Sequence, residues 1–297
     1  MSPDGMLWDG RRVPFTLLGG YLGAGKTTII NHIVRNAGGR KIVVLVNDVA
    51  AVNVDAALIA DHDGTTLSLT NGCVCCAIAD DFARTLEQIR EIPDPPDQVL
   101  MELSGVGEPA RVAPWASTAG FRLDGVVVVA DADQIVDLSS RQYVGDTISA
   151  QLVAADLVLL SKTDLADDGG AAARSLINGH TSAPVLEVLD GDVDIDLVLG
   201  TGRDQAAVSP ISGRPGRYDT SVIELGAATR QELVDLVEAL PADVVRAKGL
   251  VWCDDLDAPV EVHVVGRRRT IRLRRDLPVG RAAQRLIVIT PVPRRDA

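Results

Sequence analysis

The first two hundred residues alternate between short, nearly continuous apolar runs and segments of mixed polarity. Runs of this length, rich in Val, Ile and Leu and followed by glycine or polar residues, are typical of strands buried on both faces of a sheet. Strands are therefore predicted over residues 13–18, 41–46, 67–69, 99–103, 125–130, 157–160 and 184–189.

Two of the intervening segments are predicted helices. Residues 28–36 end just before a pair of glycines, and residues 79–91 carry apolar side chains at helical spacing before a proline-rich stretch. Glycine and proline both end helices. Buried strands alternating with helices indicate an α/β fold, with a mainly parallel sheet covered by helices. In such a sheet, ligands bind beyond the carboxyl ends of the strands.

The pattern changes near residue 200. Glycine and proline are frequent over 201–217, which predicts a linker. Beyond it, Thr229-Arg230-Gln231-Glu232 has the form of a capping box and opens a helix predicted to reach Leu240. Short strands are expected over residues 221–225, 249–253, 260–265, 270–273 and 286–290. We therefore expect one domain over 12–200 and a smaller α+β domain, with a largely antiparallel sheet, over 218–297.

Composition narrows the classes of partner. The chain has 297 residues, 46% of them apolar, and a formal net charge of -12. Residues 1–217 hold 16 Lys and Arg against 29 Asp and Glu, whereas residues 218–297 hold 13 against 12. An acidic chain repels a phosphate backbone, so nucleic acid is not an expected partner.

No apolar stretch approaches the roughly 18 residues that span a membrane, and the charged first dozen residues do not resemble a signal peptide. A cytoplasmic location without membrane association is expected.

A phosphate-loop pattern, G-x-x-x-x-G-K-[ST], lies between the first predicted strand and the first predicted helix. Its glycines let backbone N–H groups converge on phosphate oxygens at a helix N-terminus. The lysine then reaches the terminal phosphates, and the threonine hydroxyl binds Mg²⁺. A plain glycine-rich turn would not require this strand and helix around it. The residues predicted to bind the nucleotide here are Gly20, Gly23, Ala24, Gly25, Lys26, Thr27 and Thr28.

Acidic residues follow several of the predicted strands. Glu102 stands near the end of one strand, in the position that holds Mg²⁺ through water in phosphate-loop enzymes. Gly105 lies just beyond it, where a backbone N–H can meet the γ-phosphate. Asp48 follows the second strand and is a candidate to approach Mg²⁺ when the triphosphate is bound. No glutamine or arginine can be assigned to the attacking water, so slow intrinsic hydrolysis is expected.

The sequence Ser161-Lys162-Thr163-Asp164 follows another strand and matches the guanine-reading motif [NST]-K-x-D. Asp164 can accept hydrogen bonds from both the ring N–H and the exocyclic amine of guanine, and the stem of Lys162 can lie along the base. GTP is therefore favoured over ATP. Ser161 replaces the usual asparagine, and losing that amide is expected to weaken base binding. A strand-end turn in which Asp164 caps a helix is the alternative interpretation.

Three of the four cysteines, Cys73, Cys75 and Cys76, crowd into one short segment. Three thiolates on one short loop suit Zn²⁺ or Cu⁺ and accept Co²⁺. An open fourth position would suit transfer of a metal rather than a structural site. Three buried thiols or a redox switch are the alternatives. No histidine stands at ligand spacing from them, although His62 is the nearest in sequence.

Taken together, these motifs resemble the CobW-type family of P-loop GTPases. The resemblance runs from about residue 12 to 290 and rests on the phosphate loop, Asn71-Gly72-Cys73-Val74-Cys75-Cys76, Glu102-Leu103-Ser104-Gly105, Ser161-Lys162-Thr163-Asp164 and Lys248-Gly249-Leu250-Val251-Trp252. It implies a GTPase metallochaperone that binds metal at the cysteines and releases it under nucleotide control. A client metalloprotein or the cobalamin pathway would receive the metal, and Mg²⁺ would accompany GTP.

Two departures from the family leave the metal open between zinc and cobalt. The first switch commonly reads N-E-F-G-E, whereas residues 47–51 here read Asn-Asp-Val-Ala-Ala. Any metal-binding role of the second glutamate therefore cannot be carried to Ala51. Histidine-rich stretches found in some members are also absent. A cobalt-specific activator of the nitrile hydratase type, a phosphotransferase and a thiol redox sensor remain alternative functions, and oligomerisation is possible.

Overall fold

A computed structural model describes residues 12–47, 66–69, 79–118, 120–199, 218–266, 268–275 and 284–291. The chain divides into two compact units, Met1–Thr181 with Val185–Gly202, and Ser182–Pro184 with Arg203–Ala297. No helix in the described part of the chain is long and apolar enough to cross a membrane. Asp48, the three clustered cysteines and the predicted linker over 201–217 lie outside the described residues.

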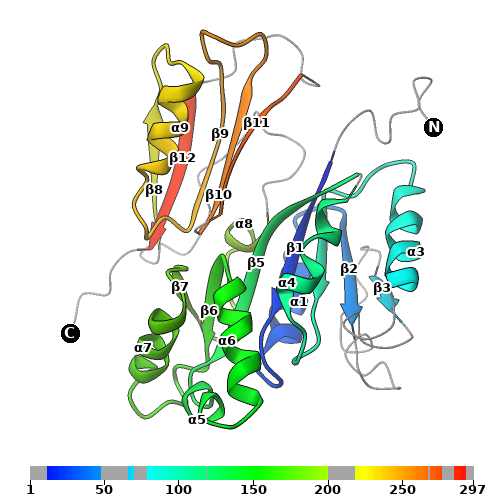
Figure 1. Ribbon diagram of the computed structural model, residues 1–297, viewed down its shortest axis with the longest axis vertical. Coiled ribbons are helices and arrows are strands. Elements are labelled where there is room, and N and C mark those ends of the chain that lie inside the picture. Colours follow the sequence, from blue (N-terminus) through cyan, green and yellow to red (C-terminus); the bar gives the residue numbers. More distant parts are fainter. Residues whose placement is uncertain are drawn as a thin grey trace. The chain divides into compact units, whose positions relative to one another are not determined.

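The first unit is built on a seven-stranded sheet with the order β3-β2-β4-β1-β5-β6-β7 (Figure 1). All six pairings within it are parallel, as predicted. Its strands are β1 (Val13–Gly19), β2 (Ile42–Asn47), β3 (Thr66–Leu69), β4 (Gln98–Glu102), β5 (Phe121–Asp131), β6 (Leu157–Ser161) and β7 (Val185–Val188). Continuous burial along β4 and β6 explains why these strands have no polar face.

Helices pack on both faces of this sheet (Figure 1). The two predicted helices are present, and the first begins two residues earlier than predicted because Gly25 opens it in a left-handed conformation. The other helices of this unit were not predicted from the sequence: α6 and α7 are about as long as α1, and the rest have five residues or fewer. The helices of the first unit are α1 (Lys26–Arg35), α3 (Ala79–Arg90), α4 (Pro109–Val112), the 3₁₀ helix η2 (Trp115–Ser117), α5 (Ile135–Ser139), α6 (Val144–Ala154), α7 (Ala171–His180) and α8 (Ile195–Val198).

Strand β5 begins four residues before the predicted start. Its first residues pair with β1, Val13 opposite Phe121, and a register shift separates this pairing from the later one. Arg122 and Asp124 interrupt the apolar run, so the sequence pattern stopped short of them. Both side chains are nevertheless buried, and they form an ion pair at 3.2 Å. Pairing a buried charge removes most of the cost that would otherwise exclude it from a strand.

The second unit is a five-stranded sheet with the order β11-β10-β9-β12-β8, in which every described pairing is antiparallel. One helix, α9 (Arg230–Glu238), packs on it through Leu233 and Val237. This is the α+β arrangement that the sequence predicts. Its strands are β8 (Tyr218–Glu224), β9 (Arg246–Val251), β10 (Val260–Val265), β11 (Arg268–Leu273) and β12 (Arg285–Pro291).

The predicted capping box at the start of α9 is formed. The Thr229 hydroxyl accepts from the Glu232 backbone N–H at 3.3 Å, and the Glu232 carboxylate accepts from the Thr229 N–H at 2.8 Å. Thr229→Ala should lower the stability of the second unit by about 1 kcal/mol, because it leaves helix donors unpaired. Urea unfolding followed by circular dichroism measures this. Gln231 is exposed and lies in the first turn of the same helix. Gln231→Ala should change the free energy of unfolding by only a few tenths of a kcal/mol, and an equal loss in both variants would contradict the prediction.

A candidate nucleotide-binding site

The carboxyl ends of four adjacent strands, β4-β1-β5-β6, bring the predicted nucleotide motifs to one edge of the sheet (Figure 1). The phosphate loop follows β1, Glu102 ends β4, Asp131 ends β5 and Ser161 ends β6. Because neighbouring parallel strands end side by side, residues that are far apart in the sequence meet here.

The phosphate loop has a backbone that only glycine adopts readily. Gly20, Gly23 and Gly25 have φ angles of 134°, 79° and 96°. At Gly20 a Cβ atom would lie 2.3 Å from the carbonyl oxygen of Val129, so this residue must also pass close to β5. At Gly23 and Gly25 a Cβ atom would meet nothing within 4 Å. The loop therefore borders open space at the N-terminus of α1, which is the geometry that fits a bound phosphate.

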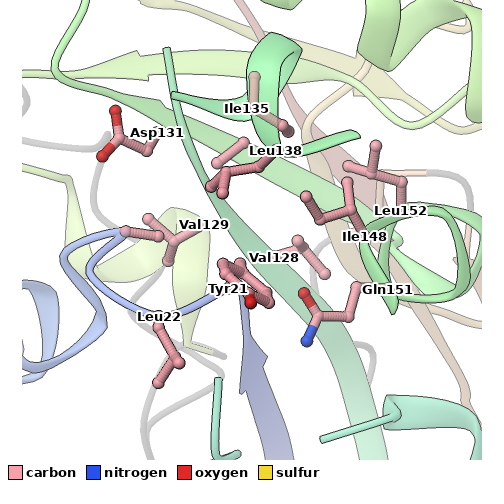
Figure 2. Close-up of a pocket in the computed structure, with 12 residues that line it drawn as sticks. Tyr21, Leu22, Val128, Val129, Asp131, Ile135, Leu138, Ile148, Gln151 and Leu152 are labelled. Atoms are coloured by element: carbon pink, nitrogen blue, oxygen red, sulfur yellow. The ribbon is translucent and has the colours of Figure 1, made fainter. Parts of the chain in front are cut away.

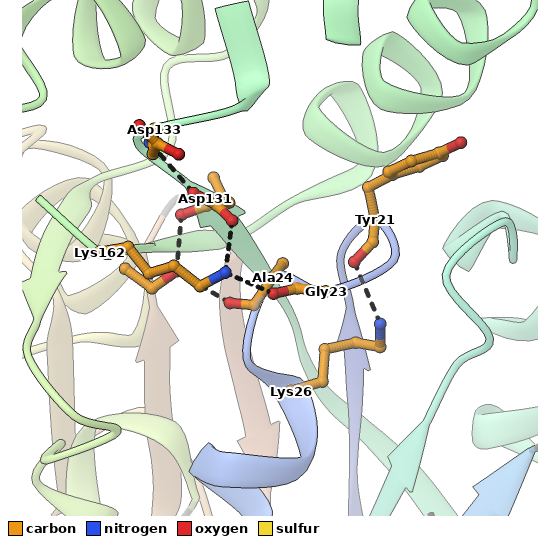
Figure 3. Close-up of polar contacts among 9 residues, drawn as sticks. Tyr21, Gly23, Ala24, Lys26, Asp131, Asp133 and Lys162 are labelled. Carbon is orange, nitrogen blue, oxygen red and sulfur yellow. Dashed lines mark hydrogen bonds and ion pairs between the residues drawn. The ribbon is translucent and has the colours of Figure 1, made fainter. Parts of the chain in front are cut away.

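Lys26 folds back into the loop that precedes it. Its Nζ donates to the carbonyl oxygen of Gly20 at 2.9 Å. It also donates to the carbonyl oxygen of Tyr21, at 3.3 Å (Figure 3). The side chain is 8% exposed. These carbonyls hold the ammonium group at the mouth of the loop, where phosphate oxygens can exchange with them as acceptors.

Thr27 and Glu102 meet across the boundary between α1 and β4. The Thr27 hydroxyl donates to Glu102 Oε1 at 3.4 Å. The pair forms because Leu18 and Glu102 are partners in the β1–β4 register, which places the acid directly beside the loop. Glu102 is buried, with 4% of its surface exposed. A hydroxyl and a carboxylate side by side are oxygen ligands of the kind that Mg²⁺ prefers.

Gly105 lies against the phosphate loop. A Cβ atom added to it would lie 2.7 Å from the backbone nitrogen of Leu22 and 2.5 Å from Leu22 Cδ2. Sequence reasoning missed a residue that holds this segment, Gln151 of α6, whose amide bonds to the carbonyls of Gly105 and Gly107. In the sequence, the role of Gln151 is indicated only by its position as a polar residue at the start of an otherwise apolar helical turn, Gln151 to Ala154.

Hydrogen bonds join the predicted guanine-reading motif to the phosphate loop. Lys162, in a left-handed conformation with φ 56°, donates to Gly23 O at 2.9 Å and to Asp131 Oδ2 at 2.6 Å (Figure 3). The Ser161 hydroxyl donates to Ala24 O at 2.8 Å. The serine therefore braces the loop although it lacks the usual amide. The side chain of Asp164, the predicted base-binding residue, is exposed to solvent. Thr28, predicted to bind the nucleotide from the phosphate loop, packs beside Gly191.

A small pocket lies on the β5 side of the phosphate loop. It encloses about 20 Å³, which is roughly room for one water molecule. Asp131 and Gln151 lie at opposite ends of its lining, and the side chains between them are mostly apolar (Figure 2). A cavity of this size does not hold a nucleotide, whereas the loop at Gly23 and Gly25 borders open space.

No metal cluster of three or more His, Cys, Asp or Glu residues occurs in the described ranges. The described part of the chain contains one cysteine, Cys253, which is free and buried. Burial raises the pKa of its thiol. The thiolates of Cys73, Cys75 and Cys76, and the carboxylate of Asp48, belong to ranges that are not described.

Family comparison agrees with this geometry. Residues 14–185 match the family model described as the CobW/HypB/UreG nucleotide-binding domain, and residues 221–297 match the cobalamin synthesis protein CobW C-terminal domain. The chain belongs to the CobW family of P-loop GTPases. The resemblance predicted from the motifs is thereby confirmed, and the CobW nucleotide-binding match covers the sheet edge described above.

Several curated proteins are similar to this CobW-family chain over most of its length. The zinc chaperone CobW of a Sinorhizobium species is 29% identical over 86% of both chains. The zinc chaperone YjiA of Escherichia coli is 28% identical over 82% of both. The zinc-regulated GTPase metalloprotein activator 1 of Schizosaccharomyces pombe is 30% identical, over 61% of this chain and 47% of that protein.

Proposed function

We propose that this protein is a cytoplasmic, GTP-hydrolysing metallochaperone that binds zinc at Cys73, Cys75 and Cys76 and delivers it to a client metalloprotein. The conjunction of a phosphate loop with the Gly-Cys-x-Cys-Cys motif carries the proposal. Relatives named as zinc chaperones support zinc as the cargo. Three thiolates within four residues suit Zn²⁺ and also accept Co²⁺, so cobalt is the competing cargo.

The residues around the phosphate loop have separate tasks in binding and hydrolysing GTP. Lys26 exchanges its carbonyl acceptors for oxygens of the terminal phosphates, and the open backbone at Gly23 and Gly25 accommodates the others. Thr27 and Glu102 would hold Mg²⁺, which when bound would offset negative charge on the phosphates. A backbone N–H at Gly105 meets the third phosphate. These groups orient the phosphates and stabilise the charge on them, which is most of what catalysis of phosphoryl transfer requires.

Nucleotide control of the metal follows from the order of the motifs along the chain. The cysteines lie between Asp48, the residue expected to approach Mg²⁺ when the triphosphate is bound, and Gly105, the residue expected to meet the γ-phosphate. GTP with Mg²⁺ orders the segments at both positions and changes the geometry of the cysteine segment between them. Hydrolysis removes that constraint, and the metal passes to the docked client.

Titration of zinc, and separately cobalt, into the reduced protein tests the coupling. The affinity is measured once with a nonhydrolysable GTP analogue and once with GDP. The proposal expects different affinities in the two nucleotide states and a preference for zinc. Cys75→Ser should abolish tight binding, whereas Cys253→Ala, at the buried cysteine outside the motif, should retain it. Equal affinity in both states would contradict nucleotide control, and retained zinc binding in Cys75→Ser would contradict the site.

Guanine recognition is tested at Asp164. Asp164→Asn should weaken GTP binding by at least about a hundredfold, because an amide cannot accept both guanine hydrogen bonds. The same variant should gain affinity for xanthosine triphosphate, whose C2 carbonyl can accept from the new amide. Competition against a fluorescent GTP analogue measures both. Asp167→Asn, at a second exposed aspartate nearby, is the control and should bind GTP normally. An unchanged base preference in Asp164→Asn would rule out this role.

A further inference from the structure

Gln151 links helix α6 to the segment that follows β4. Its Nε2 donates to Gly107 O at 2.9 Å and to Gly105 O at 3.1 Å. The side chain is 2% exposed. A primary amide has two N–H bonds, so both of its donors are directed at the same short segment. The contact joins residues more than forty positions apart in the sequence.

The segment held in this way is closely confined on its other side. Gly107 N–H donates to Ser104 O at 2.7 Å, which closes a tight turn around Gly105 and Val106. Gly105 itself lies against the backbone of Leu22 in the phosphate loop, with no space for a side chain. The Gly105 peptide therefore lies between two constraints, the phosphate loop and the amide of Gln151.

We propose that Gln151 is a positioning residue, which holds the Gly105 peptide where its N–H group meets the third phosphate of GTP. This inference rests on the GTP binding proposed above. Gln151 does not touch the nucleotide. Its Nε2 donates to the carbonyl oxygens of Gly105 and Gly107, and fixing these carbonyls confines residue 105 and limits the positions that the Gly105 N–H, in the preceding peptide, can take.

A merely structural role for Gln151 makes a different prediction. A buried amide that only stabilises the fold would, when removed, affect GDP and GTP binding alike. A positioning role affects only the nucleotide with a third phosphate, because GDP has no group at that place. The ratio of the two affinities therefore separates the two roles.

The experiment compares Gln151→Met with Gln98→Met in the full-length protein. Gln98 is equally buried, donates to Thr16 Oγ1 at 2.8 Å and lies at the opposite end of β4 from Glu102. Affinities for GDP and for a nonhydrolysable GTP analogue are measured with Mg²⁺ and without zinc. Gln151→Met should weaken analogue binding about tenfold and GDP binding by no more than about twofold. Gln98→Met should leave the ratio as in the unaltered protein.

Gln151→Glu provides a second variant of the same shape. Its carboxylate would face two carbonyl oxygens, so it should reduce analogue binding at neutral pH at least as much as Gln151→Met does. A ratio in both Gln151 variants equal to that of the unaltered protein would overturn the proposal. An unaltered protein that binds neither nucleotide would instead refute the GTP site itself, so the two failures are distinguishable.

Hydrogen exchange in the unaltered protein gives a test that needs no variant. Backbone amides of residues 103–108 should exchange more slowly with the GTP analogue than with GDP, because the third phosphate adds a hydrogen bond to a segment that Gln151 has placed. Identical exchange of this segment in the two states would overturn the proposal even if the Gln151 variants fail to fold.

Discussion

Lys26→Ala should lower the rate of GTP hydrolysis by about 10²–10³-fold, since removal of one preorganised donor to a developing charge typically costs that much. The ammonium group is held at the mouth of the phosphate loop by the carbonyls of Gly20 and Tyr21. Arginine is not expected to rescue the activity, because its planar guanidinium is larger than a compact ammonium. Phosphate release under saturating GTP measures the effect.

Lys41→Ala is the matched control for Lys26. Lys41 pairs with Asp94 on the surface, where both side chains are 56% exposed. Surface pairs of this kind contribute little, so stability should change by less than about 1 kcal/mol, and hydrolysis should be unaffected. Similar losses of activity in the two variants would show that Lys26 has no special role at the loop.

Gly20→Ala should destabilise the first unit by about 4 kcal/mol. Two costs add at this position. A left-handed φ of 134° is unfavourable for alanine, and the new Cβ atom would lie 2.3 Å from Val129 O in β5, the strand beside β1. The midpoint of urea unfolding measures the loss, and nucleotide binding should fall with it because the loop must move away from β5.

Gly39→Ala separates the two costs. Gly39 also has a positive φ, of 82°, but an added Cβ atom would meet nothing within 4 Å. Only the backbone cost remains, so a loss of about 1–2 kcal/mol is expected. If Gly20→Ala were no more destabilising than Gly39→Ala, the close approach of the loop to β5 would not be a constraint on the fold.

The sequence pattern predicted strands well where they are uniformly apolar and less well where buried charges interrupt them. Strand β9 begins at Arg246, three residues before the predicted start, because Arg246 and Lys248 broke the apolar run. Both are buried, and Arg246 Nη2 donates to His263 Nε2 at 2.8 Å. The hydrophobic pattern of a sequence shows that a side chain is charged but does not show its partner on the neighbouring strand. A charged residue that is paired and buried is therefore predicted to end a strand.

By itself, the sequence determined the phosphate-loop pattern, the alternation of buried strands with helices and the family, and it predicted a guanine-reading motif, because each is recognised from short local stretches of the chain. Only the tertiary structure decided which distant groups meet: Thr27 with Glu102, Lys162 with Asp131, and Gln151 with Gly105. These contacts depend on the strand order β4-β1-β5-β6 and on the packing of α6. Local propensity carries no information about that order, which the burial of all the strands together selects.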